Sequence, residues 1–275
     1  MKGSLELEET LVYIYKELAG LPLEEILILS EVDSTNDIAR GRLELKSSVL
    51  VVAESQRAGR GRGGRRWESP RGGLWFSLGF REDETLGPGG LPLGFISILT
   101  GVAVAEALRG MGFKARLKWP NDVLIDDKKV AGILVEVDLQ GGQKALVIGI
   151  GVNVNIPEEE LQKRVEGTRV GTLSGLAGRQ ISRVEVLSRI LEEFFREWEL
   201  WRSGRGRREG ILRRWKELSS TLNREVTVIS ASGGEEITGV AIDLAPDGAL
   251  LIRGPDGRLR RIIEGHVISC PELNS

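Results

Sequence analysis

Residues 56–67 hold five arginines and four glycines within twelve positions, in the order Gln-Arg-Ala-Gly-Arg-Gly-Arg-Gly-Gly-Arg-Arg-Trp. Glycine is unfavourable inside helices and strands, and it lets the backbone approach a ligand closely. Arginine carries a permanent charge on a planar fork that suits phosphate and carboxylate. The segment follows an apolar run, residues 49–53, that is typical of a strand. It therefore predicts a mobile loop that leaves a sheet and closes over an anion.

Motifs of known geometry fit this loop only in part. Gly59, Gly61 and Gly64 satisfy the G-x-G-x-x-G pattern of dinucleotide-binding folds, but that pattern has to open a helix. Pro70 and a glycine pair at 72–73 follow instead. The Gly-Lys-Ser/Thr ending of a phosphate-binding P-loop is absent as well. An RNA-binding loop and a solvated surface loop stay open as alternatives.

Composition narrows the class of protein. The 275 residues carry a net charge of −2, so no overall field steers the chain toward nucleic acid. With one cysteine, Cys270, and one histidine, His266, an internal disulfide framework and a His/Cys zinc site are excluded. The N-terminus lacks the layout of a signal peptide, and no stretch is expected to span a membrane. These features predict a cytoplasmic protein that builds no metal site of its own.

Hydrophobic spacing and turn signals predict an α+β fold for the larger part of the chain. Helices are expected at about 7–18, from 34 onward, over 91–110 and from 182, where Ser182 and Glu185 form a capping box. Strands are expected at 26–30, 49–54, 74–80, 116–119, 123–125, 129–137 and 145–150. They would form a mixed, largely antiparallel sheet.

A different pattern begins near residue 223. Short strands are expected at 225–230, 235–242, 249–253, 258–263 and 266–269, with hairpin signals at 247–248 and 256–257. We therefore expect a main domain, residues 1–222, and a small β-barrel, residues 223–275. Only about twenty-five residues precede the first expected strand. This is too few for a winged helix-turn-helix, so no DNA-reading domain is expected.

Four segments, taken in order, resemble the biotin protein ligase family. They are residues 33–36 (Asp-Ser-Thr-Asn), 56–67, 118–122 (Lys-Trp-Pro-Asn-Asp) and 149–153 (Gly-Ile-Gly-Val-Asn). The strand at 130–136 and the terminal β module are also similar to that family, so the resemblance runs from about residue 26 to the end. It implies a class II synthetase-like catalytic core followed by an SH3-like barrel.

The resemblance also implies a reaction in two steps. Biotin and MgATP give biotinyl-5′-AMP and pyrophosphate, and the biotinyl group then passes to a lysine of a biotin carboxyl carrier protein, such as that of acetyl-CoA carboxylase. Two anions have to meet in the first step, so fixed cations are the main catalytic tool. Mg²⁺ is expected to arrive with ATP. Specific DNA and a membrane are not expected as partners, and a homodimer is left open.

The family's functional residues map onto matching motifs. Lys118 is the expected central cation, and Arg62 joins it in catalysis. The expected biotin site contains Ser34, Thr35, Asn36, Gln56, Gly59, Arg60, Gly61, Arg62, Lys118 and Gly132. The expected ATP site contains Arg60, Arg62, Arg65, Trp67, Lys118 and Asn153. Asp122 is expected to brace its turn rather than to bind magnesium, and Ser34 has the plain alternative role of a helix cap.

The chain also departs from the family pattern. Val170 or Gly171 stands where many members carry an aromatic residue that stacks on adenine, so the sequence names no adenine platform. Gly63 stands where the loop often has a bulkier residue. A lipoate protein ligase shares the fold and the adenylation chemistry and is the nearest alternative. An RNA-binding protein that uses the arginine loop is the alternative from another class.

Overall fold

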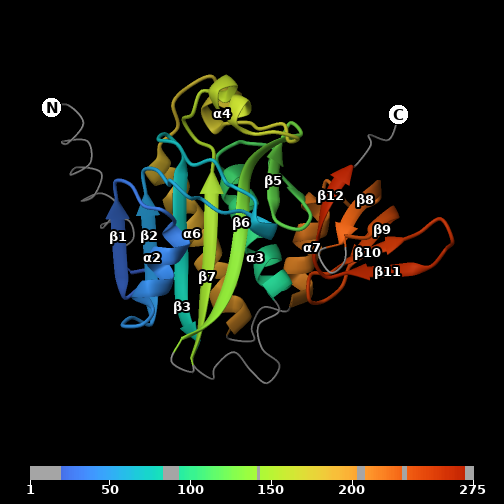
Figure 1. Ribbon diagram of the computed structural model, residues 1–275, viewed down its shortest axis with the longest axis horizontal. Helices are drawn as coiled ribbons and strands as arrows, with labels where there is room; N and C mark the ends of the chain where they lie inside the picture. The colour runs from blue at the N-terminus through green and yellow to red at the C-terminus, as the bar shows by residue number, and fades with distance from the viewer. Residues whose placement is uncertain (1–19, 83–92, 141–142, 203–207, 231–233, 270–275) are drawn as a thin grey trace.

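The computed structural model describes residues 20–82, 93–140, 143–202, 208–230 and 234–269 (Figure 1). The helix expected at 7–18 lies outside these ranges. The first half of the chain forms β1 (Glu25–Leu29), α2 (Thr35–Arg42), β2 (Ser48–Ala53), the 3-10 helix η1 (Arg62–Gly64), β3 (Leu74–Glu82), α3 (Leu93–Gly110), β4 (Arg116–Lys118), β5 (Asp122–Ile125) and β6 (Lys128–Gln140). The second half forms β7 (Gln143–Val152), α4 (Glu158–Arg164), α5 (Leu173–Ala177), α6 (Arg183–Arg202), α7 (Arg208–Leu218), β8 (Glu225–Ser230), β9 (Glu236–Leu244), β10 (Leu250–Arg253), β11 (Leu259–Ile262) and β12 (Gly265–Ser269).

The main sheet has seven strands in the order β1-β2-β3-β7-β6-β5-β4. Only β1 and β2 run parallel; the other pairs are antiparallel. The predicted mixed sheet is therefore confirmed. The turn between β5 and β6 is made by Asp126 and Asp127, both with positive φ, as an aspartate hairpin requires.

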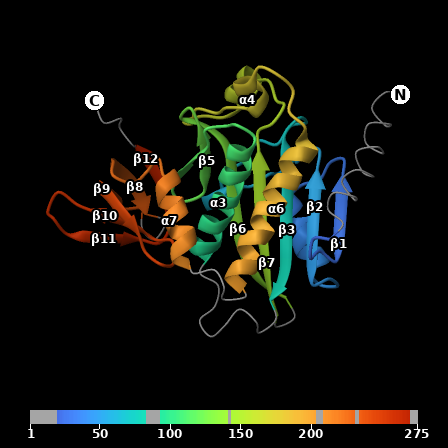
Figure 2. The same cartoon turned by 180° about the vertical axis from the view of Figure 1, so that it is seen from behind.

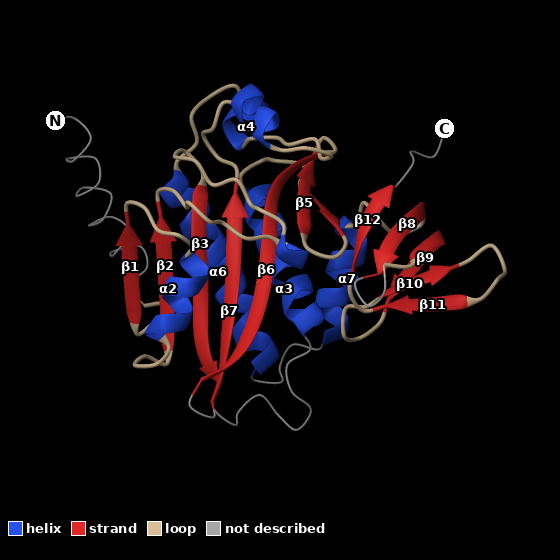
Figure 3. Cartoon of the chain, in the orientation of Figure 1, coloured by secondary structure: helices blue, strands red, loops and turns tan. Residues whose placement is uncertain are grey.

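Helices cover the two faces of this sheet unequally. Helices α3, α6 and α7 lie behind it, as Figure 2 shows, while α2 lies on the opposite face against β2, β3 and β7. The segment that joins β2 to β3 crosses that same face, as Figure 3 makes visible. Ser182 caps α6 by accepting a bond from the Glu185 amide at 3.2 Å, as the capping box predicts. The short helices α4 and α5 were not anticipated.

Helix α3 corrects one prediction. Its 18 residues have a mean hydropathy of 1.5, so by length and composition it could cross a membrane, although no such stretch was expected. Within the protein, 72% of that helix is buried. It packs between the sheet and helices α6 and α7. Its apolar character on every side therefore follows from its central position.

The terminal strands form a second, antiparallel sheet in the order β11-β10-β9-β8-β12. It lies beside the β4 end of the main sheet (Figure 1). Trp119, which directly follows β4, is buried and donates its indole N–H to the Gly248 carbonyl at 3.0 Å. One apolar cluster includes α3 residues together with Val226, Val228 and Leu250 of the second sheet. The second sheet is therefore held rigidly at the edge of the main one.

Candidate active site

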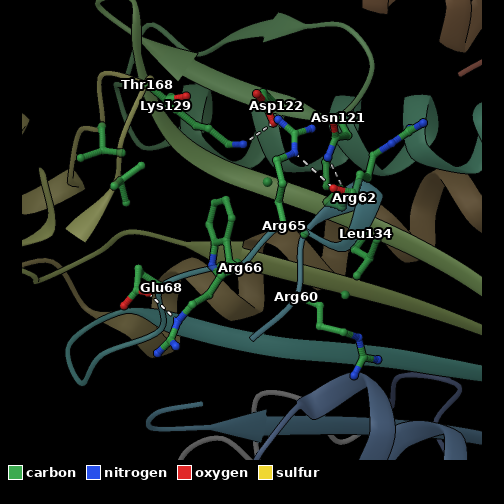
Figure 4. A pocket seen from close by; sticks show the side chains of 18 of the residues that line it. Arg60, Arg62, Arg65, Arg66, Glu68, Asn121, Asp122, Lys129, Leu134 and Thr168 are labelled. Carbon is green, nitrogen blue, oxygen red and sulfur yellow. Dashed lines mark hydrogen bonds and ion pairs between the residues drawn. The ribbon is translucent and has the colours of Figure 1, made fainter. Parts of the chain in front are cut away.

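A cavity of about 220 Å³ lies on the α2 face of the main sheet. Its walls come from the start of α2, the loop between β2 and β3, strands β4 to β7, residues 161–170 and strand β12. Each residue expected at the site lines this cavity except Gly59. The loop arginines reach it from the front, and Figure 4 shows Arg60 turned toward α2 while Arg65 lies near Asn121 and Asp122.

One side of the cavity is a network of neutral polar groups, here called the polar half: Ser34, Thr35, Asn36, Gln56 and Ser77. The Thr35 amide and hydroxyl both donate to Gln56 Oε1, at 2.8 and 3.1 Å. Ser77 Oγ lies 2.7 Å from Thr35 Oγ1 and 2.6 Å from Asn36 Oδ1, so its single proton serves one of them at a time. Ser34 stands at the N-cap of α2, yet its hydroxyl makes no capping bond. The side chain at the cap therefore stays available to a ligand.

Charged residues anchor the polar half to the sheet. Asn36 Nδ2 donates to Glu136 Oε2 at 2.7 Å. Arg60 binds Asp37 through both terminal nitrogens, at 2.5 and 2.8 Å, and lies 3.3 Å from Glu136. This pairing holds the pKa of the Asp37 carboxyl below its usual range and raises that of Arg60. The ion pairs of Arg60 thus fix the loop to α2 and β6, and Arg60 also forms part of the cavity wall.

Two glycines permit this close packing. A Cβ on Gly149 would lie 2.3 Å from Asn36 Oδ1, so only glycine lets α2 approach β7 at this point. A Cβ on Gly59 would lie 2.4 Å from the Trp67 carbonyl oxygen. Gly59 therefore shapes the loop from behind the cavity wall. The structure gives it a backbone role and no place on the cavity surface.

The opposite side of the cavity gathers positive charge and is here called the cationic half: Arg62, Arg65, Lys118 and Lys129. Lys129 is paired with Asp122 at 2.6 Å, so Asp122 ties β5 to β6, and the predicted brace of the turn at 120–122 stays a prediction. Within the described ranges, Arg62, Arg65 and Lys118 have no carboxylate within ion-pairing distance. Like charges held together without counterions attract an anion into the space between them. This half is built to receive one.

The tip of the arginine loop has the predicted irregular backbone. Gly63 and Gly64 adopt φ angles of 64° and 73°, a conformation that favours glycine. Arg65 Nε donates to the Arg62 carbonyl at 3.2 Å and closes this turn (Figure 4). Burial lowers the pKa of the Arg62 guanidinium, opposed by the negative charges of Glu264 and Asp122. A partly desolvated cation of this kind gains from meeting an anion.

Trp67 lies flat between the loop and the sheet. A Cβ on Gly151 would lie 2.5 Å from its Nε1, and a Cβ on Gly132 would lie 2.8 Å from its Cζ3, so both glycines make room for the ring. Lys129 Nζ lies 4.9 Å from the ring centroid, within cation–π range. Trp75 meets it edge-on at 6.4 Å. The indole is thereby fixed as part of the cavity wall.

Asn153 is almost fully buried and ties two segments together. Its Nδ2 donates to the carbonyls of Lys129 and Gly171, at 3.2 and 3.1 Å. These bonds place the 165–170 segment over the cavity, where Thr168 and Val170 form part of the wall. Apart from the missing aromatic residue at 169–173, no pattern in the sequence indicates that this segment covers the cavity.

The terminal module supplies residues that sequence reasoning did not assign to the site. His266, Val267 and Ile268 of β12 line the same cavity as Lys118. His266 is half-buried there. Burial and the positive charges of Arg65 and Lys118 lower the pKa of its imidazole to about 4. The available signal was that this is the only histidine of the chain.

The described residues contain no group of three or more His, Cys, Asp or Glu side chains that could hold a metal ion. Cations in this cavity are supplied by arginine and lysine. The arrangement can bind a neutral polar ring at one side, hold a polyanion at the other and stabilise charge that develops between them.

Comparisons with known proteins point to the same chemistry. Residues 29–153 match the model of the biotin/lipoate A/B protein ligase family, and residues 221–268 match that of the biotin protein ligase C-terminal domain. The chain is 35% identical to the bifunctional ligase/repressor BirA of Escherichia coli over 248 residues, which are 88% of this chain and 73% of that protein. It is 32% identical to a biotin–[acetyl-CoA-carboxylase] ligase of Paracoccus denitrificans over 84% of this chain and 95% of that one.

A solved structure agrees with both relatives. The biotin protein ligase of Aquifex aeolicus in complex with biotin and ATP superposes with a TM-score of 0.72 and 31% identity. The match covers 89% of this chain and 98% of that one.

Proposed function

Because this chain belongs to the biotin protein ligase family, it adenylates biotin with ATP and passes the biotinyl group to a protein lysine, and we propose that the cavity between the polar and cationic halves is the site of both steps. One observation carries the assignment. Lys118 faces the cavity with no carboxylate partner among the described residues, while neighbouring Lys129 is neutralised by Asp122.

In the first step the biotin carboxylate attacks the α-phosphorus of ATP. A bond forms from carboxylate oxygen to phosphorus, and the bond from phosphorus to the bridging oxygen breaks, releasing pyrophosphate. Negative charge on the two reactants opposes their approach and grows on the phosphoryl oxygens. Lys118 and Arg62 supply fixed positive charge at that point. Each such donor is worth about 3–4 kcal/mol in the barrier.

The polar half suits the ureido ring of biotin. A buried ureido group has to keep its hydrogen bonds. Thr35, Asn36 and Gln56 offer hydroxyl and amide groups already held by hydrogen bonds, and Ser34 adds a hydroxyl without a capping bond. Gly61, Arg60 and Gly132 border the same space. This network needs little reordering when biotin binds, so less conformational entropy is lost on binding.

The nucleotide belongs at the cationic half. Arg65 and Arg62 face its phosphates, and Trp67 offers an aromatic face that Lys129 already approaches. Asn153 shapes this end through its bonds to the Gly171 and Lys129 carbonyls. Mg²⁺ enters with ATP as part of the substrate. The loop tip at Gly63 and Gly64 closes over the adenylate and keeps water out until the acceptor arrives.

In the second step the amine of the acceptor lysine attacks the carbonyl carbon of biotinyl-AMP. An amide bond forms, AMP departs, and the amine loses a proton. We assign a biotin carboxyl carrier protein of acetyl-CoA carboxylase or a related carboxylase as acceptor.

We further propose that the protein acts in the cytoplasm, without specific DNA, and that residues 1–222 and 223–275 are its two domains. Self-association as a homodimer belongs to the same proposal.

Exchange of labelled pyrophosphate into ATP tests the function directly. Exchange is expected with biotin, and background exchange with lipoate or with no acid added. Exchange with lipoate alone would assign a lipoate ligase, and exchange with neither acid would remove the adenylation proposal.

A further inference from the structure

The terminal module reaches into the cavity at one titratable side chain. His266 lies on β12, the edge strand of the second sheet, and lines the cavity with Lys118 and Arg62. The Trp119 bond to Gly248 and the shared apolar core hold that sheet in place. The imidazole is therefore presented to the cavity by a rigid element rather than by a mobile loop.

The charges that act on this imidazole lie on the arginine loop and on three neighbouring strands of the main sheet. They are Arg65 on the loop, Lys118 on β4, Asp122 on β5 and Lys129 on β6. Asp122 is neutralised by Lys129, which leaves Arg65 and Lys118 as net positive neighbours. Glu264, two residues before His266, acts electrostatically on Arg62. Without a ligand, this surrounding keeps His266 neutral near physiological pH.

A bound polyanion would change the electrostatic potential at the His266 imidazole from positive to negative. The triphosphate of MgATP carries net negative charge into the cavity in place of solvent, and it neutralises the same cations that disfavour a charged imidazole. We propose that His266 is a proton-linked contact for the triphosphate of ATP, neutral in the empty cavity and protonated when the phosphates occupy it. This inference rests on the proposed function, since it takes ATP as the ligand of the cationic half.

The direction in which ATP affinity changes with pH follows from the protonation of His266 in the empty and the ATP-bound protein. If binding raises the pKa of His266, a proton is taken up with ATP, and ATP binds more tightly as the pH falls toward the pKa of the bound state. One linked proton changes the affinity by at most about tenfold for each pH unit. The proton leaves again once pyrophosphate has departed and the negative charge beside the imidazole has dropped.

Calorimetry on the full-length protein tests this. ATP binding is measured at several pH values from 6 to 8 in pairs of buffers with different ionisation enthalpies, which gives the number of protons taken up. His266→Gln keeps a neutral polar group but does not titrate. Thr238→Ala, in the same module and outside the cavity, is the control. AMP replaces ATP in a parallel series, because it lacks the β- and γ-phosphates.

The wild-type protein and Thr238→Ala are expected to take up close to one proton more than His266→Gln at pH 6. The ratio of wild-type to variant ATP affinity should rise about tenfold or more from pH 8 to pH 6. Subtracting the variant removes the titration of ATP itself. Should His266→Gln not fold, His266→Asn replaces it, and proton uptake with ATP but not with AMP remains the wild-type criterion.

Equal proton uptake in wild type and variant overturns the inference, as does equal uptake with AMP and ATP. Biotin-dependent pyrophosphate exchange is recorded on the same preparations. If exchange is present but the proton difference is absent, only the role of His266 fails. If the wild-type protein gives no exchange, the proposed function fails first.

Discussion

The two halves of the cavity contribute in opposite directions to the stability of the empty protein. In the polar half, Thr35 bonds to Gln56, and Ser77 lies within hydrogen-bond distance of both Thr35 and Asn36, before any ligand is present. In the cationic half, Arg62, Arg65 and Lys118 lack carboxylate partners throughout the described residues. The first arrangement lowers the free energy of the empty protein, whereas the second raises it through repulsion between like charges.

This contrast explains how one site can serve two kinds of ligand. A neutral ring gains most from groups that are already ordered, because ordering costs affinity. A developing negative charge gains most from cations that are not yet neutralised. Catalytic power should therefore be concentrated in the cationic half, and affinity for biotin in the polar half. Mutations in the two halves should therefore have different effects on catalysis and on biotin affinity.

The largest effect is expected from Lys118→Ala. Loss of one fixed cation at the reacting phosphate should slow biotin-dependent pyrophosphate exchange by about 10²–10³-fold, while biotin affinity changes by only a few-fold. Lys114→Ala, an exposed lysine before β4, is the matched control and should exchange like the wild type. Exchange by Lys118→Ala within twofold of wild type would remove Lys118 from the cationic half.

Asn36→Ala should act in the complementary way. The change leaves Ser77 and Glu136 without their bonds to the amide, at a cost of about 1–3 kcal/mol in the free energy of unfolding. Biotin affinity, measured by equilibrium dialysis, should fall about tenfold or more. Asn155→Ala removes a similar amide, bonded to Ile181 outside the cavity, and should lower stability without lowering biotin affinity. Equal biotin affinities in both variants would contradict the assignment of the polar half.

Arg62→Gly tests the difference between the anchored and the unpaired arginine of the loop. Arg60 is anchored to Asp37 and Glu136, whereas Arg62 belongs to the cationic half. Loss of Arg62 should therefore leave the fold intact and release a stable biotinyl-adenylate analogue about tenfold faster, equivalent to about 1.4 kcal/mol. Free biotinyl-AMP should then label lysines of bystander proteins. Arg57→Gly, outside the cavity, is the control, and an unchanged off-rate for Arg62→Gly would refute the lid role.

Short sequence motifs predicted much of this site. Residues 33–36 and 118–122 carry their side chains to the cavity from the start of a helix and the end of a strand, so their motifs and their positions agree. The gap between the expected strands 123–125 and 129–137 is likewise a tight turn, and the positive φ angles of Asp126 and Asp127 are a local property of that turn.

Other parts depend on contacts between distant residues and could not be predicted. The sequence assigns both Arg60 and Arg62 to the biotin and ATP sites but does not reveal that Arg60 is anchored, because its ion pairs span 23 and 76 residues of chain. His266 enters the cavity because a whole second sheet docks on Trp119, 147 positions earlier in the chain. The short helix α4 lacks a periodic apolar face, with Leu161 as its one buried residue, so its pattern was too weak.

The smallest effect is expected from Asp37→Asn, which weakens the anchor of Arg60. Asp37 is 44% exposed, and Glu136 still holds Arg60, so the free energy of unfolding at pH 7 should fall by at most about 1 kcal/mol. The folded-state pKa of Asp37 lies below its ordinary value of 3.8. Its contribution is therefore complete above pH 3.8 and is lost as the pH falls through the lowered pKa.

Urea unfolding at a series of pH values checks this, with Asp33→Asn as the control because its partner Arg57 lies on an open surface. The difference between wild type and Asp37→Asn should be constant from pH 5 to 7 and shrink below pH 3.8. Pyrophosphate exchange should stay close to the wild-type rate, because Glu136 keeps the Arg60 guanidinium on the polar side. A loss of exchange as large as that of Lys118→Ala would mean that the two halves are not separate, and that the anchored arginine contributes to catalysis as much as the unpaired lysine.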